Sequence, residues 1–150
     1  MQKPLPLKDL DLSAYRYIDG KLYKEAGHEA GKGYRRISIG GVRYLVHRII
    51  FFMHHGYEPE VVDHADRDPT NNAIENLRAA TKAENAYNCG VRTDSSSGFR
   101  NVIWHGKKLK WQVRLMQSGK CKSYGLYHDI EEAAKVAATA RKDNYGDFAT

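Results

Sequence analysis

Cysteine is scarce in this chain of 150 residues, with only Cys89 and Cys121 present. The two do not form a paired-cysteine motif, so the sequence supports neither a disulfide framework nor a structural zinc site. No stretch has the pattern of a secretory leader. We therefore expect a protein of a reducing cytoplasm in which both thiols are inert.

Long hydrophobic runs are missing as well. The longest strongly apolar run is Ile49-Ile50-Phe51-Phe52-Met53, whereas a membrane-spanning helix needs about 20 apolar residues. The sequence thus predicts a soluble protein with no membrane partner. Its length suits one ordinary domain or two small ones.

Positive charge is in excess and unevenly distributed. The formal net charge is +6 and the pI is about 9.3, which favours an anionic partner. Residues 1–95 carry 14 Lys and Arg against 13 Asp and Glu, whereas residues 96–150 carry 10 against 5. Residues 100–122 hold seven basic side chains and no acidic one. We expect the basic surface to belong to the C-terminal third.

One stretch has the composition of a linker. Asp94-Ser95-Ser96-Ser97-Gly98 is small, polar and rich in serine. This predicts a domain at residues 1–93, a linker at 94–98 and a second domain at 99–150. No internal repeat is evident.

The N-terminal part alternates apolar and polar residues between glycine-rich turns. From Tyr15 to Tyr44 this pattern predicts two or three short antiparallel strands. Leu45, Ile49 and Phe52 then recur at helical spacing, and Gly56 ends the pattern. The expected turns are Asp19-Gly20, Gly31-Lys32-Gly33 and Gly40-Gly41.

Asp63-His64, followed by Asn76 and Asn85, has an order and spacing that fit a small metal-dependent nuclease site. Such a site needs a general base whose unperturbed pKa lies near neutral pH, and His64 can be that base. It also needs hard oxygen ligands for an ion of the Mg²⁺ type, which Asp63 and Asn85 can supply. An Asp-His pair alone is more often a hydrogen-bonded turn, so the prediction depends on the residues around it.

Those surroundings predict two strands and a helix. Residues 60–63 and 76–79 each suit a short strand, and the turn formers between them require the chain to loop back. Thr81 and Glu84 have the spacing of a helix capping box, which places Asn85 in the first turn of a helix beginning at Lys82. Asn76 could tie the loop to itself by side-chain hydrogen bonds.

Residues 45–88 resemble the HNH endonuclease family, in the subgroup of phage and intron-encoded homing nucleases. The matching motifs are Val46-His47-Arg48, Val62-Asp63-His64, Asp68-Pro69-Thr70-Asn71-Asn72, Ile74-Glu75-Asn76-Leu77 and Glu84-Asn85. The resemblance implies a ββα-metal site that cuts DNA in bacterial or phage-infected cells and leaves 5′-phosphate and 3′-hydroxyl ends.

The family's roles transfer residue by residue. The resemblance implies His64 and Asn76 as catalytic residues, the first as general base and the second as the asparagine that orders the loop. It implies Asp63 and Asn85 as ligands of one Mg²⁺ or Mn²⁺, with no other small-molecule cofactor. Asn85 stands where the family name has its final His, a variant found in the homing subgroup, and this bears on metal preference.

Three further strands and a helix are predicted after residue 98. Strands at 99–104, 110–116 and 121–127 are separated by turn-like segments, and Asp129 with Glu132 caps a final helix rich in alanine. One face of the middle strand is apolar and the other is polar. The predicted fold class is therefore α+β: a ββα-metal nuclease module followed by a three-stranded antiparallel sheet packed on one helix.

This C-terminal segment resembles the plant ethylene-response-factor (apetala-type) DNA-binding domain, which also occurs fused to homing nucleases. Matching motifs are Gly98-Phe99-Arg100-Asn101-Val102, Trp111-Gln112-Val113-Arg114-Leu115, Tyr124-Gly125-Leu126-Tyr127, Glu131-Glu132-Ala133-Ala134 and Tyr145-Gly146. The resemblance implies that Arg100, Ile103, His105, Lys110, Arg114, Met116 and Ser123 face DNA. Because Ile103, Met116 and Ser123 stand where the plant domain has Arg or Trp, they cannot make the same contacts, and the plant target sequence does not transfer.

A basic sheet face can enter the major groove of duplex DNA, where Arg and Gln read base edges and Lys contacts phosphates. The predicted DNA-binding residues are Arg100, His105, Lys108, Lys110, Gln112, Arg114, Lys120 and Lys122. Two alternatives remain: a DNA-binding regulator with a decayed nuclease module, and an RNA-binding or processing protein. His47 suits phosphate contact or a structural role about equally, and Asn71-Asn72 reads as loop structure.

Overall fold

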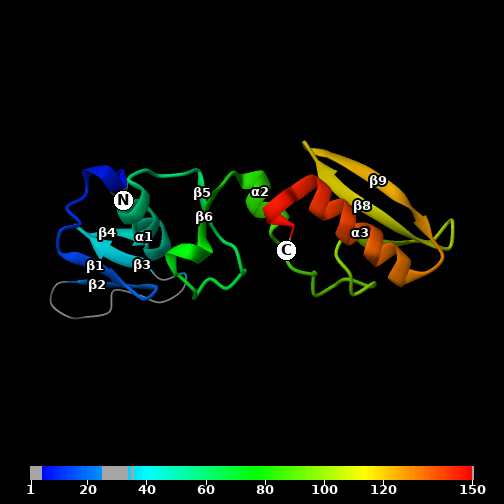
Figure 1. Cartoon of the computed structure of the whole chain (residues 1–150), viewed down its shortest axis with the longest axis horizontal. Helices are drawn as coiled ribbons and strands as arrows, with labels where there is room; N and C mark the ends of the chain where they lie inside the picture. Colours follow the sequence, from blue (N-terminus) through cyan, green and yellow to red (C-terminus); the bar gives the residue numbers. More distant parts are fainter. Residues whose placement is uncertain (1–4, 25–33, 35, 150) are drawn as a thin grey trace. The chain divides into compact units, whose positions relative to one another are not determined.

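The computed structural model describes residues 5–24, 34 and 36–149, and the chain divides into two compact units, Met1–Asn85 and Ala86–Thr150. The architecture is mixed, with several small antiparallel sheets and few helices (Figure 1). Each unit has its own hydrophobic core. Within the described residues no helix is long and apolar enough to cross a membrane.

A 3-10 helix, Leu7–Asp9, and then two hairpins come first among the described residues of the first unit. Strands β1 (Tyr15–Ile18) and β2 (Lys21–Lys24) pair antiparallel, as do β3 (Arg36–Ile39) and β4 (Val42–Leu45). Gly20 turns the first hairpin with a φ of 75°, a left-handed conformation that suits glycine. The predicted turn at Gly31-Lys32-Gly33 lies outside the described residues.

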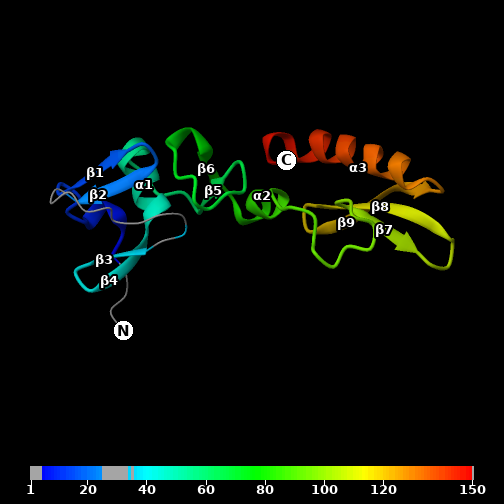
Figure 2. The same ribbon diagram turned by 90° about the horizontal axis from the view of Figure 1, so that it is seen from below.

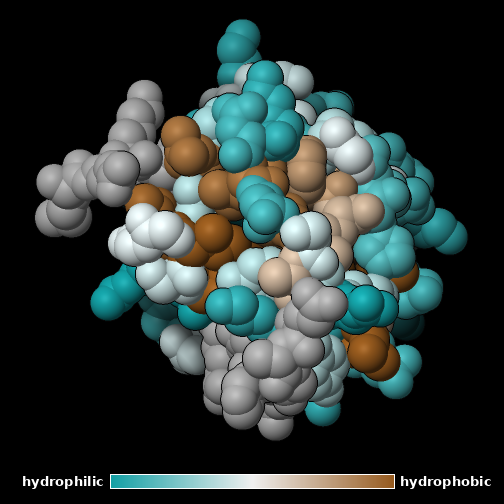
Figure 3. All heavy atoms as spheres, turned by 90° about the vertical axis from the view of Figure 1, so that its left-hand side faces the viewer, coloured by the Kyte–Doolittle hydropathy of each residue, from teal (hydrophilic) through white to brown (hydrophobic). Residues whose placement is uncertain are grey.

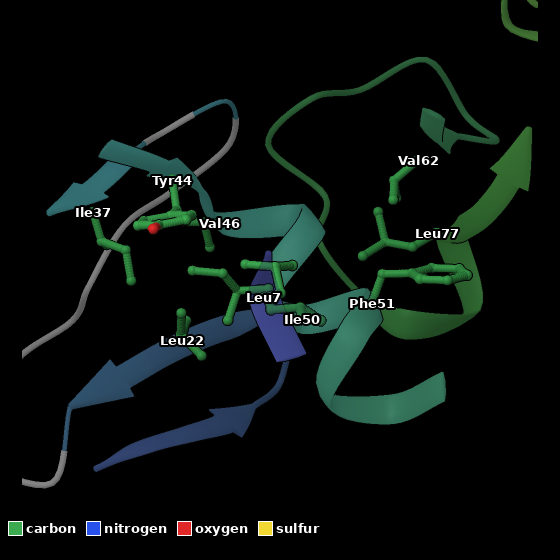
Figure 4. Close-up of a cluster of buried hydrophobic side chains, with 10 residues drawn as sticks. Leu7, Leu22, Ile37, Tyr44, Val46, Ile50, Phe51, Val62 and Leu77 are labelled. Atoms are coloured by element: carbon green, nitrogen blue, oxygen red, sulfur yellow. The ribbon is translucent and has the colours of Figure 1, made fainter. Parts of the chain in front are cut away.

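Helix α1 (Val46–His55) follows β4 directly and forms the centre of the first core. Gly56 ends it in a left-handed conformation, and its N–H bonds to the Phe52 carbonyl at 2.8 Å. Ile49 and Ile50 are fully buried. Figure 4 shows Leu22, Ile50 and Phe51 among the side chains of this core. On the face shown in Figure 3, hydrophobic residues gather between hydrophilic ones.

The first unit closes with two strands and a short helix. Strand β5 (Val61–His64) pairs antiparallel with β6 (Leu77–Ala80), one residue later at each end than the sequence predicted. A 3-10 helix, Ile74–Asn76, precedes β6. Helix α2 (Lys82–Tyr87) begins where expected, and its capping box forms: the Thr81 N–H donates to Glu84 at 2.7 Å and the Glu84 N–H to Thr81 Oγ1 at 3.2 Å.

The second unit is a three-stranded sheet with one helix. Strands β7 (Val102–His105), β8 (Lys110–Gln117) and β9 (Lys120–Tyr127) are antiparallel in the order β7-β8-β9. Helix α3 (Ile130–Tyr145) covers one face of this sheet (Figure 2). Its N-cap Asp129 accepts from the Glu132 N–H at 2.8 Å, as the sequence predicted. Its Ala133, Ala137 and Ala140 pack in the core with Val102, Val113 and Leu115.

The division between the units differs in position from the predicted linker. It falls between Asn85 and Ala86, inside α2, whereas residues 94–98 lie within the second unit. The serine-rich stretch is not bare linker, because Ser97 is buried and its hydroxyl donates to the Val102 carbonyl at 2.7 Å. Upstream, the Tyr87 ring stacks on Tyr145 at 3.9 Å, so packing in the second unit starts before residue 94.

Candidate functional site

The strand pair β5–β6 carries the Asp-His pair. In the register, Asp63 lies opposite Arg78 and His64 opposite Leu77. Neighbouring residues of a strand point to opposite faces, so the two side chains meet different groups. Both are buried, with Asp63 5 % exposed and His64 2 % exposed. Buried polar side chains need partners, and these partners define the site.

Arg78 is the cross-strand partner of Asp63. Its Nε and Nη2 both contact Asp63 Oδ2, at 2.9 Å and 2.8 Å. The guanidinium therefore neutralises a carboxylate that would be costly to bury alone. It also fixes the direction in which that carboxylate presents its oxygens.

Asn72 is the partner of His64, and it is 1 % exposed. Its Oδ1 lies 3.0 Å from His64 Nε2. An amide oxygen can only accept, so the neutral imidazole carries its proton on Nε2 and its lone pair on Nδ1. The contact thus selects one tautomer and holds the ring in one orientation.

Asn76 ties the intervening loop together with three hydrogen bonds. Its Oδ1 accepts from the Asp66 N–H at 3.0 Å, and its Nδ2 donates to Asp66 Oδ1 at 2.9 Å and to the Asn71 carbonyl at 2.8 Å. Burial alone would raise the pKa of Asp66. Hydrogen bonds from Asn71, from the Asp68 N–H and from Asn76 outweigh it and lower that pKa below its ordinary value. This network holds the segment that presents Asn72.

His47 lies against the other side of His64. Their ring centroids are 5.1 Å apart, and the Tyr34 ring lies edge-on to both, at 5.5 Å and 5.4 Å. Burial, His64 and the nearby Arg48 lower the pKa of His47 to about 4. The ring is therefore neutral at physiological pH. Tyr34 is 63 % exposed and forms the solvent edge of this cluster.

Asn85 lies on α2 with its side chain exposed and its N–H bonded to the Thr81 carbonyl at 3.0 Å. Lys82, at the start of the same helix, contacts Glu60 next to β5 at 3.3 Å. Asp63 lies on β5 and Asn85 on α2, and the Lys82–Glu60 ion pair links the beginnings of these two elements. Two hard oxygens suit an ion of the Mg²⁺ type, which takes most of its ligands from water and phosphate. Within the described ranges no cluster of three or more His, Cys, Asp or Glu forms a metal cage.

The sequence patterns assign no site role to four residues of this cluster. Asn72 has the pattern of loop structure, His47 suits phosphate contact or a structural role equally, and Arg78 and Tyr34 belong to no predicted site. Asn72 and His64 are eight residues apart in the sequence, so no local pattern indicates their hydrogen bond. Arg78 can be identified as the partner of Asp63 only when the register of β5 and β6 is known. The one available signal was the density of asparagines in the loop.

In the second unit, four predicted DNA-binding residues share the sheet face opposite α3. Val113 and Leu115 are buried under α3, so the alternation of β8 turns Gln112 and Arg114 outward. Lys110 and its register partner His105 lie on the same face. Gln112 Nε2 donates to Ser123 Oγ at 3.2 Å, and Arg114 Nε contacts Cys121 Sγ at 3.1 Å.

The other four predicted residues lie elsewhere. Arg100 donates to the Tyr87 carbonyl at 2.6 Å and is half-buried. Lys122 pairs in register with the buried Leu115, so it belongs to the α3 side, where its ammonium lies 5.3 Å from the Tyr124 ring centroid. Lys108 lies in the β7–β8 turn and Lys120 begins β9, and both are exposed.

Two comparisons with known proteins return matches. Residues 44–87, which include α1, β5, β6 and α2, match the family model of the HNH endonuclease. Over 88 residues the chain is 30 % identical to protein 3.8 of Escherichia phage T7, an alignment that covers 59 % of this chain and 72 % of the phage protein. No solved structure matches the chain.

Proposed function

The chain belongs to the family of phage protein 3.8 and carries an HNH endonuclease domain at residues 44–87, and from this we propose that it is a metal-dependent DNA endonuclease of the homing type. In this proposal β5, β6 and α2 form the ββα-metal module, and His64 is the general base. The observation that carries it is the buried contact between His64 Nε2 and Asn72 Oδ1 at 3.0 Å. It holds a basic Nδ1 in a fixed orientation, which general-base catalysis requires.

The chain's own residues perform the proton transfer. His64 Nδ1 takes a proton from a water molecule, and the resulting hydroxide attacks phosphorus in line with the departing 3′ oxygen. Asn72 keeps the ring in the required tautomer, and Asn76 holds the loop that carries Asn72. His47 stays neutral beside His64. It therefore places no positive charge next to the general base, which becomes positively charged when it takes up a proton.

Asp63 and Asn85 would hold one Mg²⁺ or Mn²⁺, with Arg78 orienting the carboxylate. When bound, such an ion stabilises the negative charge that develops on the phosphate and on the leaving oxygen. Tyr34 lies at the exposed edge of the His cluster, and in this proposal it would contact the incoming strand.

The second unit would hold the duplex. Its resemblance to the ethylene-response-factor domain supports this role, as does a sheet face that presents Lys110, Gln112 and Arg114 away from the core. Residues 86–150 carry 11 basic and 6 acidic side chains, so an anionic partner is electrostatically favoured.

Plasmid nicking tests the nuclease proposal. The purified chain should nick supercoiled plasmid with Mg²⁺ and should stop when the ion is chelated. His64→Ala should abolish nicking and leave DNA binding intact, whereas the control His128→Ala, at an exposed histidine after β9, should cut like the wild type. Cleavage by His64→Ala at the wild-type rate would overturn the mechanism.

One observation favours a second candidate, a DNA-binding regulator with a decayed nuclease module. Arg78 already neutralises Asp63, and a guanidinium competes with a metal ion for the same carboxylate. On this alternative the chain binds plasmid without nicking it at any Mg²⁺ or Mn²⁺ concentration. The same assay, read together with DNA binding, decides between the two.

A further inference from the structure

The outward face of the β7-β8-β9 sheet mixes cations with exposed apolar side chains. Ile103 is 41 % exposed and Met116 is 48 % exposed. Both lie on the face opposite α3, because their neighbours Val102 and Leu115 are buried in the core. Ile103 and Met116 do not fill the core, so both offer apolar contact surface to a ligand on the face that carries Lys110 and Arg114.

Gln112 stands between two apolar residues in one row across the sheet. It pairs in register with Ile103 on β7 and with Leu126 on β9, and directly opposed side chains on one face lie about 5 Å apart. The bond from Gln112 Nε2 to Ser123 uses one of its N–H groups. The second N–H and the carbonyl oxygen still offer a donor and an acceptor, beside a branched methyl surface.

This combination matches one base pair in the major groove. Adenine presents the N7 acceptor and the N6 donor, which a Gln amide pairs with bidentately, and its partner thymine presents a C5 methyl that apolar side chains contact. Gln112 can therefore pair with the adenine of an A·T pair, while the adjacent Ile103 contacts the methyl group of its thymine. Arg114, the next outward residue, has the geometry for a guanine edge instead.

We propose that the outward face of this sheet reads A·T pairs in duplex DNA, with Ile103 and Met116 sensing thymine methyl groups and Gln112 reading adenine. The proposal rests on the proposed function, because it requires this unit to hold DNA. The occupant is duplex DNA because Lys110 and Arg114 stand on this face and residues 100–122 contain no acidic side chain that would repel phosphate. The exposed Lys108 and Lys120, in and next to the turns, add positive charge at the ends of the strands.

Geometry also separates the two methyl sensors. Gln112, the register partner of Ile103, and Met116 are four residues apart on β8, a rise of about 13 Å. One base-pair step rises about 3.4 Å. If β8 follows the groove, the two sensed thymines stand about four base pairs apart, with the Arg114 contact between them.

The test removes the methyl from the DNA. The full-length wild type, with chelator present to prevent cleavage, first enriches duplexes from a random pool. The enriched duplex is then synthesised with thymine or with uracil, which differ only in the C5 methyl. We expect the enriched site to contain A·T pairs. Replacing one contacted thymine by uracil should lower the affinity about fourfold, which is the factor that corresponds to burying one methyl-sized group.

Variants assign the effect to residues. Ile103→Ala and Met116→Ala should each lower the thymine-to-uracil affinity ratio, and the double variant should bring it close to one. Gln112→Ala should weaken both duplexes equally, because adenine is unchanged. Val91→Ala is the matched control: Val91 is also 48 % exposed in this unit, lies outside the sheet, and should keep the wild-type ratio.

The outcomes separate the two proposals. A wild-type ratio of one, or a raised ratio that survives in the double variant, overturns the reading of thymine by this face and leaves DNA holding intact. No affinity for any duplex at low salt overturns DNA holding itself, and with it the proposed role of the second unit. The uracil comparison uses unmodified protein, so it does not depend on whether a variant folds.

Discussion

The two units place their functional side chains in opposite environments. In the first unit His47, Asp63, His64 and Asn72 are all buried and bound to one another or to Arg78. In the second unit Lys110, Gln112 and Arg114 lie on an open sheet face with few partners. The charge follows the same division, with 13 basic and 12 acidic residues in 1–85 against 11 and 6 in 86–150.

This difference follows from the tasks we propose for the two units. A reacting group must be held to within a fraction of an ångström, so neighbours must fix its rotamer and tautomer. A groove-reading face must instead keep its donors and acceptors available to the bases. Substitutions in the first unit should therefore change the rate, and substitutions in the second should change affinity and salt dependence.

The largest expected effect is that of His64→Ala. Removal of a general base costs on the order of 10²–10⁴-fold in rate. In single-turnover nicking at saturating protein, His64→Ala should lose this factor, whereas Arg114→Ala should keep its rate once enough protein is added to compensate for weaker binding. Equal rate losses in both variants would contradict the division of labour.

Asn72→Ala should have the next largest effect. The variant loses the acceptor that holds His64 Nε2–H, so the ring can rotate or change tautomer. Loss of such an orienting partner typically costs about 10 to 100-fold. Asn72→Asp keeps an oxygen at the same place and should retain more of the nicking rate than Asn72→Ala. If the two variants cut equally well, Asn72 does not orient the base.

How far the sequence predicts this arrangement depends on the distance over which each interaction acts. The capping box of Thr81 and Glu84, the N-cap Asp129 and the strand pair beside Asp63 are local patterns, and the structure confirms them. The contacts of His64 with Asn72 and His47 depend on how the loop and α1 pack. No short-range pattern encodes them.

The position of the domain division shows the same limit. Serine-rich composition predicts a linker at 94–98. In the structure, however, the Ser97 hydroxyl bonds to the Val102 carbonyl and Tyr87 stacks on Tyr145, and residues 86–98 belong to the second unit. Composition reports the average polarity of a stretch. It does not report whether particular hydroxyls find buried carbonyl partners.

Arg78→Met tests the electrostatics of the first unit. Loss of the guanidinium leaves Asp63 buried without its counter-charge, which should cost about 3 kcal/mol of stability. If Asp63 binds a divalent ion, added Mg²⁺ should restore part of this loss. Hydrogen exchange in β5 and α1 follows the first unit, while fluorescence of Trp104 and Trp111, the chain's two tryptophans, follows the second and should not change.

His47→Leu should alter the acid side of the stability profile. The folded-state pKa of His47 is about 4 because of burial and the adjacent His64 and Arg48, against 6.5 for an exposed histidine. Between these values the unfolded chain binds a proton that the folded chain does not, so stability falls as the pH drops from 6.5 towards 4. The variant should lack about 2 to 3 kcal/mol of this decline. Urea unfolding of both proteins at pH 7.5 and 4.5, followed by hydrogen exchange in α1, measures the difference; identical declines would contradict it.

The smallest effects are expected on the open face of the second unit, where Arg114 and Lys110 should behave differently. Arg114→Ala, which removes a guanine-reading fork, should cost roughly 1–3 kcal/mol and relax preference at one position. Lys110→Ala, which removes a phosphate contact, should weaken binding to all sequences alike and reduce the slope of log K against log salt by about one unit. Binding titrations of the full chain with chelator present, at several salt concentrations and on the enriched and mismatched duplexes, separate the two. If Arg114→Ala changes only the salt slope, Arg114 contacts phosphate. Base recognition on this face would then depend on its uncharged residues, Ile103, Gln112 and Met116.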